Sequence, residues 1–80
     1  MRAIPNPSAN ITVIRFVATE NMDVTITLTN NLGQIVYQKN KTTSLGENQE
    51  SIDLSTLSAG VYCVSLNTNT QQSTIKIIKN

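Results

Sequence analysis

Apolar residues along this chain recur at every second position, in short runs that are separated by clusters of turn-forming residues. The clearest run is residues 22–29, where Val24, Ile26 and Leu28 alternate with polar residues. Because successive side chains of a β-strand point to opposite faces, this run predicts a strand with one apolar and one polar face. Nowhere do apolar residues recur at helical spacing over a useful length. The pattern therefore predicts an all-β protein.

The same alternation predicts further strands. In residues 11–16 both faces carry apolar side chains, so the sequence does not assign which face of this strand points inward. In residues 35–39, Ile35 and Tyr37 are expected on one side and Val36 on the other. The remaining strands are residues 51–54, 61–66 and 73–79. The expected inward residues of the first two are Ile52, Leu54, Tyr62, Val64 and Leu66. In the last strand, Ile75 and Ile77 are expected on one face and Lys76 and Ile78 on the other.

Turn signals separate these strands. In residues 30–33, Asn30 is expected to cap a turn through its side-chain amide, and Gly33 to take a positive φ. Residues 40–50 are polar apart from Leu45, which predicts the longest and most mobile loop, with that leucine as its only anchor. Six or seven short strands at this spacing predict an immunoglobulin-like antiparallel β-sandwich.

The segment Leu57-Ser58-Ala59-Gly60-Val61-Tyr62 predicts a corner between the two sheets. Gly60 is expected to adopt a backbone conformation that is costly for residues with a Cβ, while Leu57 packs beneath it. The spacing between Gly60 and Tyr62 suggests the hypothesis that Tyr62 is a corner tyrosine, whose hydroxyl bonds to nearby backbone.

Eighty residues are enough for one domain with a small core, since a chain of this size buries only about 60–65% of its unfolded surface. We expect a single domain over residues 1–80, with a linker and opening segment at residues 1–9 and the sandwich at residues 10–79. The net charge is +1 and the basic residues are scattered, so nucleic acid is not an expected partner. No apolar run approaches the length needed to cross a bilayer.

The sequence offers little material for catalysis, because histidine is absent and Cys63 is the only cysteine. We expect Cys63 to be an inert, half-buried thiol. Glu47, Glu50 and Asp53 could form a hard-cation site, but they lack the pattern of a calcium loop, so a solvated acidic stretch is the favoured interpretation. We therefore predict no enzyme activity, no cofactor and no metal site. The glycosylation patterns at Asn10 and Asn40 are what chance gives in a chain rich in Asn and Thr.

Three short motifs occur in order along the chain: Ile4-Pro5-Asn6-Pro7, Leu32-Gly33-Gln34-Ile35-Val36-Tyr37, and the corner segment followed by the terminal Lys76-Ile77-Ile78-Lys79. Together they resemble the C-terminal sorting domain, type A, of type IX secretion cargo from Bacteroidetes, over residues 4–79. From physics alone, the two prolines only stiffen the chain, and the lysines only discourage aggregation at a sheet edge. The positions that match the family's motifs are Pro5, Pro7, Gly33, Leu57, Gly60, Tyr62 and Lys79, and we add Lys76 of the same terminal strand as a candidate.

The resemblance implies a function. The domain would follow a larger cargo protein as its C-terminal signal, fold in the periplasm, and be recognised by the outer-membrane translocon and its shuttle protein. A sortase-like peptidase would then remove it at the cell surface, leaving the cargo anchored there or secreted. We expect recognition to use the terminal hairpin.

Two positions depart from the family's pattern. Asn30 stands where Asp is common, and Gln34 where a basic residue is common, which puts any charge-dependent contact there in doubt. The alternative function is an immunoglobulin- or fibronectin-like spacer or adhesion module that binds carbohydrate or protein. Carbohydrate sites generally need exposed aromatic rings, and this chain has no Trp, one Phe and two Tyr.

Overall fold

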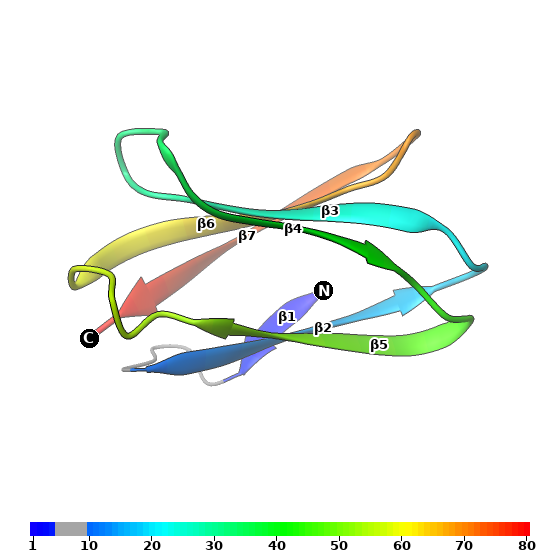
Figure 1. The fold of residues 1–80 in the computed structure, drawn as a ribbon, viewed down its shortest axis with the longest axis horizontal. Helices are drawn as coiled ribbons and strands as arrows, with labels where there is room; N and C mark the ends of the chain where they lie inside the picture. The colour runs from blue at the N-terminus through cyan, green and yellow to red at the C-terminus, as the bar shows by residue number, and fades with distance from the viewer. Residues whose placement is uncertain (5–9) are drawn as a thin grey trace.

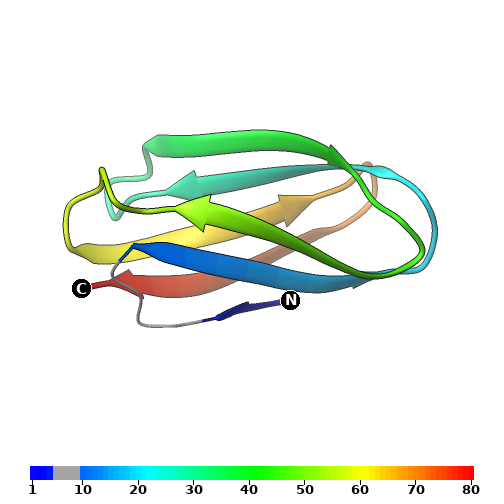
Figure 2. The same cartoon turned by 60° about the horizontal axis from the view of Figure 1, so that its bottom comes forward.

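The computed structural model describes residues 1–4 and 10–80, and every regular element in them is a β-strand. The strands are β1 (Arg2–Ile4), β2 (Ile11–Ala18), β3 (Asp23–Thr29), β4 (Ile35–Thr42), β5 (Gly46–Asp53), β6 (Gly60–Asn67) and β7 (Gln72–Lys79). They form a three-stranded sheet in the order β1-β2-β5 and a four-stranded sheet in the order β4-β3-β6-β7. Figures 1 and 2 show the two sheets lying over one another, which confirms the predicted all-β sandwich.

The chain passes between the sheets at the β2–β3, β4–β5 and β5–β6 connections. All pairs are antiparallel, and β2 pairs with β5 while β3 pairs with β6, so strands distant in sequence form the centre of the molecule. The fourth strand belongs to the second sheet, whereas in a constant-type immunoglobulin domain it extends the first. Three connections thus tie the two sheets together.

The core is one layer of apolar side chains between the sheets. On β2 the inward residues are Thr12, Ile14, Phe16 and Ala18, so the structure decides the face that the sequence left open. The three apolar residues of β3 are buried, as their alternation predicts. The buried apolar residues are Ile14, Phe16, Ala18, Val24, Ile26, Leu28, Ile52, Leu54, Tyr62, Val64 and Ile77.

The prediction of a long loop at residues 40–50 is wrong. Strand β4 continues to Thr42 and β5 begins at Gly46, which leaves only residues 43–45 as a connection. Leu45, the expected anchor, is 72% exposed. The buried residue is Thr43, whose hydroxyl donates to the carbonyl oxygen of Glu20 at 3.1 Å and accepts from the Met22 N–H at 3.1 Å. A polar side chain therefore holds this crossing, because it can satisfy the backbone groups that the crossing buries.

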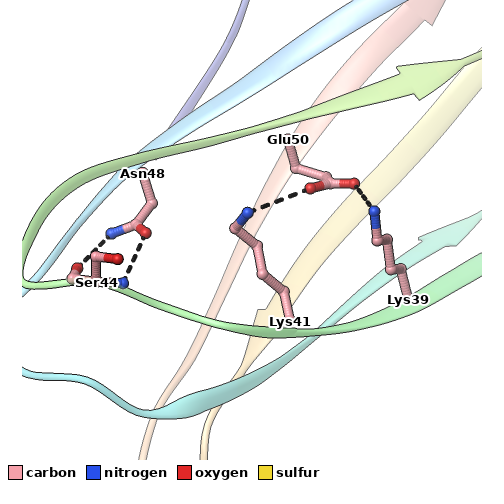
Figure 3. A network of polar contacts seen from close by, with 5 residues as sticks. All are labelled: Lys39, Lys41, Ser44, Asn48 and Glu50. Atoms are coloured by element: carbon pink, nitrogen blue, oxygen red, sulfur yellow. Dashed lines mark hydrogen bonds and ion pairs between the residues drawn. The ribbon is translucent and has the colours of Figure 1, made fainter.

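Asn48 supports the same crossing from β5. Its side-chain amide donates to the carbonyl oxygens of Ser44 at 2.8 Å and Gly46 at 3.0 Å, and its Oδ1 accepts from the Ser44 N–H at 3.0 Å (Figure 3). Asn48 is only 8% exposed, so these bonds replace the water that its amide loses. The connection is thus short and is held by several hydrogen bonds.

A charged cluster closes the side of the sandwich where β4 and β5 are the edge strands. Glu50 lies opposite Ile14 in the β2–β5 register, and Lys39 and Lys41 lie opposite buried residues of β3, so all three charged residues are on core-facing sides. The Glu50 carboxylate contacts the ammonium groups of Lys39 at 2.5 Å and Lys41 at 3.5 Å (Figure 3). This pairing contradicts the expected solvated acidic stretch at Glu50, whose side chain is 10% exposed.

Two smaller expectations also fail. A bulge between Leu28 and Thr29 shifts the β3–β4 register, so Tyr37 lies opposite Leu28 whereas Ile35 lies opposite Thr29. Ile35 and Tyr37 therefore face opposite sides, because the extra residue interrupts the alternation. In addition, part of the segment expected as a linker, residues 2–4, forms β1 and pairs with β2.

The Glu50 cluster generates a pH prediction. Its hydrogen bond from Lys39 holds the pKa of Glu50 below the usual value, so this carboxylate stabilises the fold above its unfolded-state pKa, and the contribution is lost as the pH falls through the native pKa. We expect Glu50→Gln to lower the free energy of unfolding at pH 7 by about 1 kcal/mol. The deficit should shrink as the pH falls through the native pKa, which lies below the usual range of a glutamate, and vanish once the native side chain is also neutral.

Urea denaturation of both proteins across this pH range measures the difference. Glu47→Gln, at an exposed position on the same strand, is the matched control and should change stability little. An equal effect of the two substitutions would contradict the role of the cluster.

Candidate recognition surface

The acidic residues do not converge on a reactive centre. Glu50 forms ion pairs with the two lysines of β4, and Glu47 is exposed. Asp53 accepts a hydrogen bond from the Ser55 N–H at 2.9 Å. This bond holds the pKa of Asp53 below its usual value. Within residues 1–4 and 10–80, no group of three or more His, Cys, Asp or Glu side chains is placed to hold a metal ion.

Most of the motif residues lie at one end of the sandwich, which we call the corner end. It comprises the β3–β4 turn (residues 30–34), the β5–β6 connection (residues 54–59) and the adjoining strand ends that carry Gly60–Tyr62 and Ile78–Lys79. In Figure 1 these segments lie together at the left, beside the carboxyl terminus. Lys79 lies directly opposite Gly60 in the β6–β7 register. Pro5 and Pro7 lie outside the described residues.

The tyrosine corner is confirmed. Tyr62 is 6% exposed, and its hydroxyl donates to the carbonyl oxygen of Ser58 at 2.6 Å. Gly60 has a φ of +155°, in the range that residues with a Cβ rarely adopt. Leu57 is half-buried against the core, and its N–H donates to the carbonyl oxygen of Leu54 at 3.0 Å. The motif residues of this segment therefore hold the connection in one shape as it crosses between the sheets.

The β3–β4 turn is also held by its own side chains. The Asn30 Oδ1 accepts hydrogen bonds from the N–H groups of Leu32 at 2.9 Å and Gln34 at 3.0 Å, as the sequence predicts for a capping asparagine. Gly33 has a φ of +82°, and its N–H donates to the Asn30 carbonyl oxygen at 3.0 Å. These bonds close the turn tightly.

Asn30 and Gln34, the two residues that depart from the family's pattern, are hydrogen-bonded to each other. The amide nitrogen of Asn30 donates to Oε1 of Gln34 at 2.9 Å across the turn. The turn is therefore bridged by two neutral amide side chains.

Exposed apolar side chains gather at the corner end. Val61 and Ile78 are cross-strand partners on the outer face of the four-stranded sheet and are 42% and 43% exposed. Leu32 in the β3–β4 turn is 77% exposed, and Ile35, which the bulge turns outward, is 59% exposed. Exposed apolar residues that lie next to one another are typical of binding surfaces, whereas single ones are common on any protein. The signal for Val61 and Ile78 was present in the sequence, as apolar residues at positions that the alternation places outside.

The lysines of β7 lie beside this apolar group. Lys76 is exposed and lies opposite Cys63 in the register next to the Val61–Ile78 pair. Lys79 is half-buried, and its ammonium group contacts the Asn80 carbonyl oxygen at 3.4 Å. Among the strands of the described chain, β7 is the last strand of its sheet.

Loss of the Tyr62 hydroxyl should weaken the corner. We expect Tyr62→Phe to lower the free energy of unfolding by about 0.5–1.5 kcal/mol, because the hydrogen bond from the Tyr62 hydroxyl to the Ser58 carbonyl oxygen is lost. Tyr37→Phe, at a half-buried tyrosine on β4, is the matched control, and a smaller loss is expected there. Thermal denaturation of the three proteins gives the comparison, and an unchanged melting temperature for Tyr62→Phe would show that the bond contributes nothing.

The cost of replacing Gly33 should depend on the backbone conformation that the new residue tolerates and not on the size of its side chain. A Cβ at Gly33 meets no atom within 4 Å, so the cost comes from its positive φ alone. We expect Gly33→Ala to destabilise the domain by about 1 kcal/mol, and Gly33→Asn to cost less, since Asn tolerates this conformation better. Chemical denaturation tests the order, and a larger loss for the bulkier Asn would contradict it.

Comparisons with known proteins agree with this picture. No curated protein matches the chain. The family model described as the secretion system C-terminal sorting domain matches residues 2–80, nearly the whole chain. In the part of the chain that the structure describes, no helix is long and apolar enough to cross a membrane. The resemblance drawn from the three motifs is therefore confirmed, and the chain belongs to the family of C-terminal sorting domains that mark proteins for type IX secretion.

Proposed function

We propose that this domain takes an attached cargo protein across the outer membrane, and that the translocon and its shuttle protein bind the corner end together with strand β7. Membership of the sorting-domain family makes the domain an export signal that leads to the cell surface or to secretion. The observation that carries the more specific proposal is the gathering of motif residues, exposed apolar side chains and the carboxyl-terminal strand at one end of the sandwich.

The motif residues divide into two groups in this proposal. Gly33, Leu57, Gly60 and Tyr62 fix the shape of the corner end, since each sits where the backbone turns or crosses between sheets. Lys76 and Lys79 offer positive charge beside the apolar group and contact the partner directly. Pro5 and Pro7 remain predicted motif residues of the opening segment.

A folded module suits a transport system that must accept many unrelated cargoes. Such a system can bind one common surface, so the cargo itself needs no shared sequence. In this proposal the domain folds in the periplasm and the corner end is recognised at the outer membrane. A sortase-like peptidase then removes the domain on the cell surface.

The test is export of a fluorescent cargo that carries a secretory signal peptide and this domain at its carboxyl end. We expect surface display in a strain with an intact type IX system and periplasmic retention in a strain without it. Deletion of residues 76–80 should also leave the cargo in the periplasm. Display that does not depend on the type IX system would contradict the proposal and favour a spacer or adhesion module.

The deletion removes the buried Ile77, so a surface variant is needed beside it. The pair Val61→Thr and Ile78→Thr changes only the outer face and keeps residues that favour strands. We expect this pair to reduce display while the purified domain stays folded by circular dichroism. Val17→Thr, at a 77% exposed apolar residue of the other sheet, is the matched control and should be displayed normally. Normal display of the Val61 and Ile78 variant would contradict recognition at the corner end.

A further inference from the structure

Strand β1 covers only part of the edge of β2. The pairing runs from Arg2 opposite Arg15 to Ile4 opposite Val13, whereas β2 continues to Ala18. Residues 16–18 of β2 pair with β5 on one side, and no strand of the described chain pairs with them on the other. Figure 2 shows the amino terminus partway along β2, with β2 continuing beyond it. Backbone groups at this edge are therefore available to a further strand.

A groove lies beside the uncovered edge. It has a volume of about 560 Å³ and opens between the two sheets, at the end of the sandwich opposite the corner end. Its apolar lining includes Phe16, Met22, Val24 and Leu66, and polar residues of the β6–β7 turn lie at its rim. Met1 also lines the groove and packs against the core. The amino terminus thus points along an open, partly apolar channel.

We propose that, in the cargo-bearing protein, the residues that precede Met1 continue β1 along residues 16–18 of β2 and close this groove. The inference rests on the attachment of cargo before residue 1, as in the proposed function. The register of β1 continues without change: Met1 lies opposite Phe16, the preceding residue falls opposite Val17, and the one before that falls opposite Ala18. Each added residue gains backbone partners on an edge that now has none in the described chain.

The register also assigns the faces of the added residues. Ala18 is buried and Val17 is 77% exposed, so the residue opposite Ala18 points into the groove and the residue opposite Val17 points to solvent. A single inward apolar side chain at that position would cover Phe16 and Leu66. The linker is the occupant that fits, because it is continuous with a strand already in register and is held there by its covalent bond.

This arrangement has a consequence for recognition. The extended strand leaves the sandwich at the end that carries the β2–β3 and β6–β7 connections, away from the corner end. The cargo then projects from one end of the domain while the proposed recognition surface remains uncovered at the other. The linker thus sets the direction of the cargo as well as joining it to the domain.

Two extensions of the 80-residue chain test the proposal. One places Ser-Val-Thr before Met1, which puts valine opposite Ala18 and into the groove. The matched control places Ser-Thr-Val there, which has the same composition but puts valine opposite Val17 and into solvent. We expect the first protein to melt about 4 °C or more above the second. Hydrogen exchange should also slow at those amides of residues 16–18 that do not pair with β5.

Equal melting temperatures, with exchange at residues 16–18 as fast as in the unextended chain, would overturn the proposal. A melting temperature that rises with protein concentration would also overturn it, because a second copy of the chain would then occupy the edge. Both measurements use purified protein without any secretion machinery. A negative result in these two measurements would therefore not contradict the export function. A negative result in the export assay would not contradict the strand extension.

Discussion

The structure depends on a single layer of apolar side chains held between two small sheets. A chain of 80 residues can bury few side chains, and Cys63 is its only cysteine, so no internal disulfide supports the layer. The sheets must therefore be kept in register by the connections that pass between them. Two of these connections rely on hydrogen bonds from buried polar side chains: Thr43 and Asn48 at the β4–β5 crossing, and Tyr62 at the β5–β6 crossing. In the described chain, no buried side-chain nitrogen or oxygen lacks a hydrogen-bond partner.

The two open sides of the sandwich differ in how they are closed. On the side of β4 and β5, Glu50 and the inward lysines form a charged cluster, whose long aliphatic stems cover the margin of the core. Inward charges at an edge strand discourage pairing with another chain. On the side of β1 and β7, the inward residues of β7 include the buried Ile77 and the half-buried Ile75. Both proposed contacts, a partner on β7 and the linker beside β2, lie on this second side of the sandwich.

The two ends of the molecule also differ, and this difference gives the family's short motifs a physical meaning. Residues that are far apart in sequence, Gly33, Gly60 and Lys79, come to one end because the β3–β4 turn, the β5–β6 connection and the last residues of β7 all lie there. The amino terminus lies partway along β2, and β1 runs from it toward the corner end, so the proposed linker before Met1 approaches from the other end. A sorting domain must join a cargo and present a common surface at the same time, and opposite ends of an elongated sandwich, 35 Å along its longest axis, separate these two tasks. The turn at the corner end is closed by neutral hydrogen bonds, including the bridge between the Asn30 and Gln34 side chains.

The sequence by itself determined the all-β class, the inward residues of β3 and β6, the capped turn at Asn30 and the corner at Gly60 and Tyr62. These features are local, since alternation and turn chemistry are properties of neighbouring residues. Only the tertiary structure decided that residues 40–42 and 46–50 are strands, because polar edge strands are held by backbone pairing that leaves no apolar pattern. It also decided that Glu50 is paired across the sheets, that a bulge turns Ile35 outward and that residues 2–4 form β1. Each of these depends on partners distant in the chain, and the alternation of a single segment does not specify which strand will lie beside it.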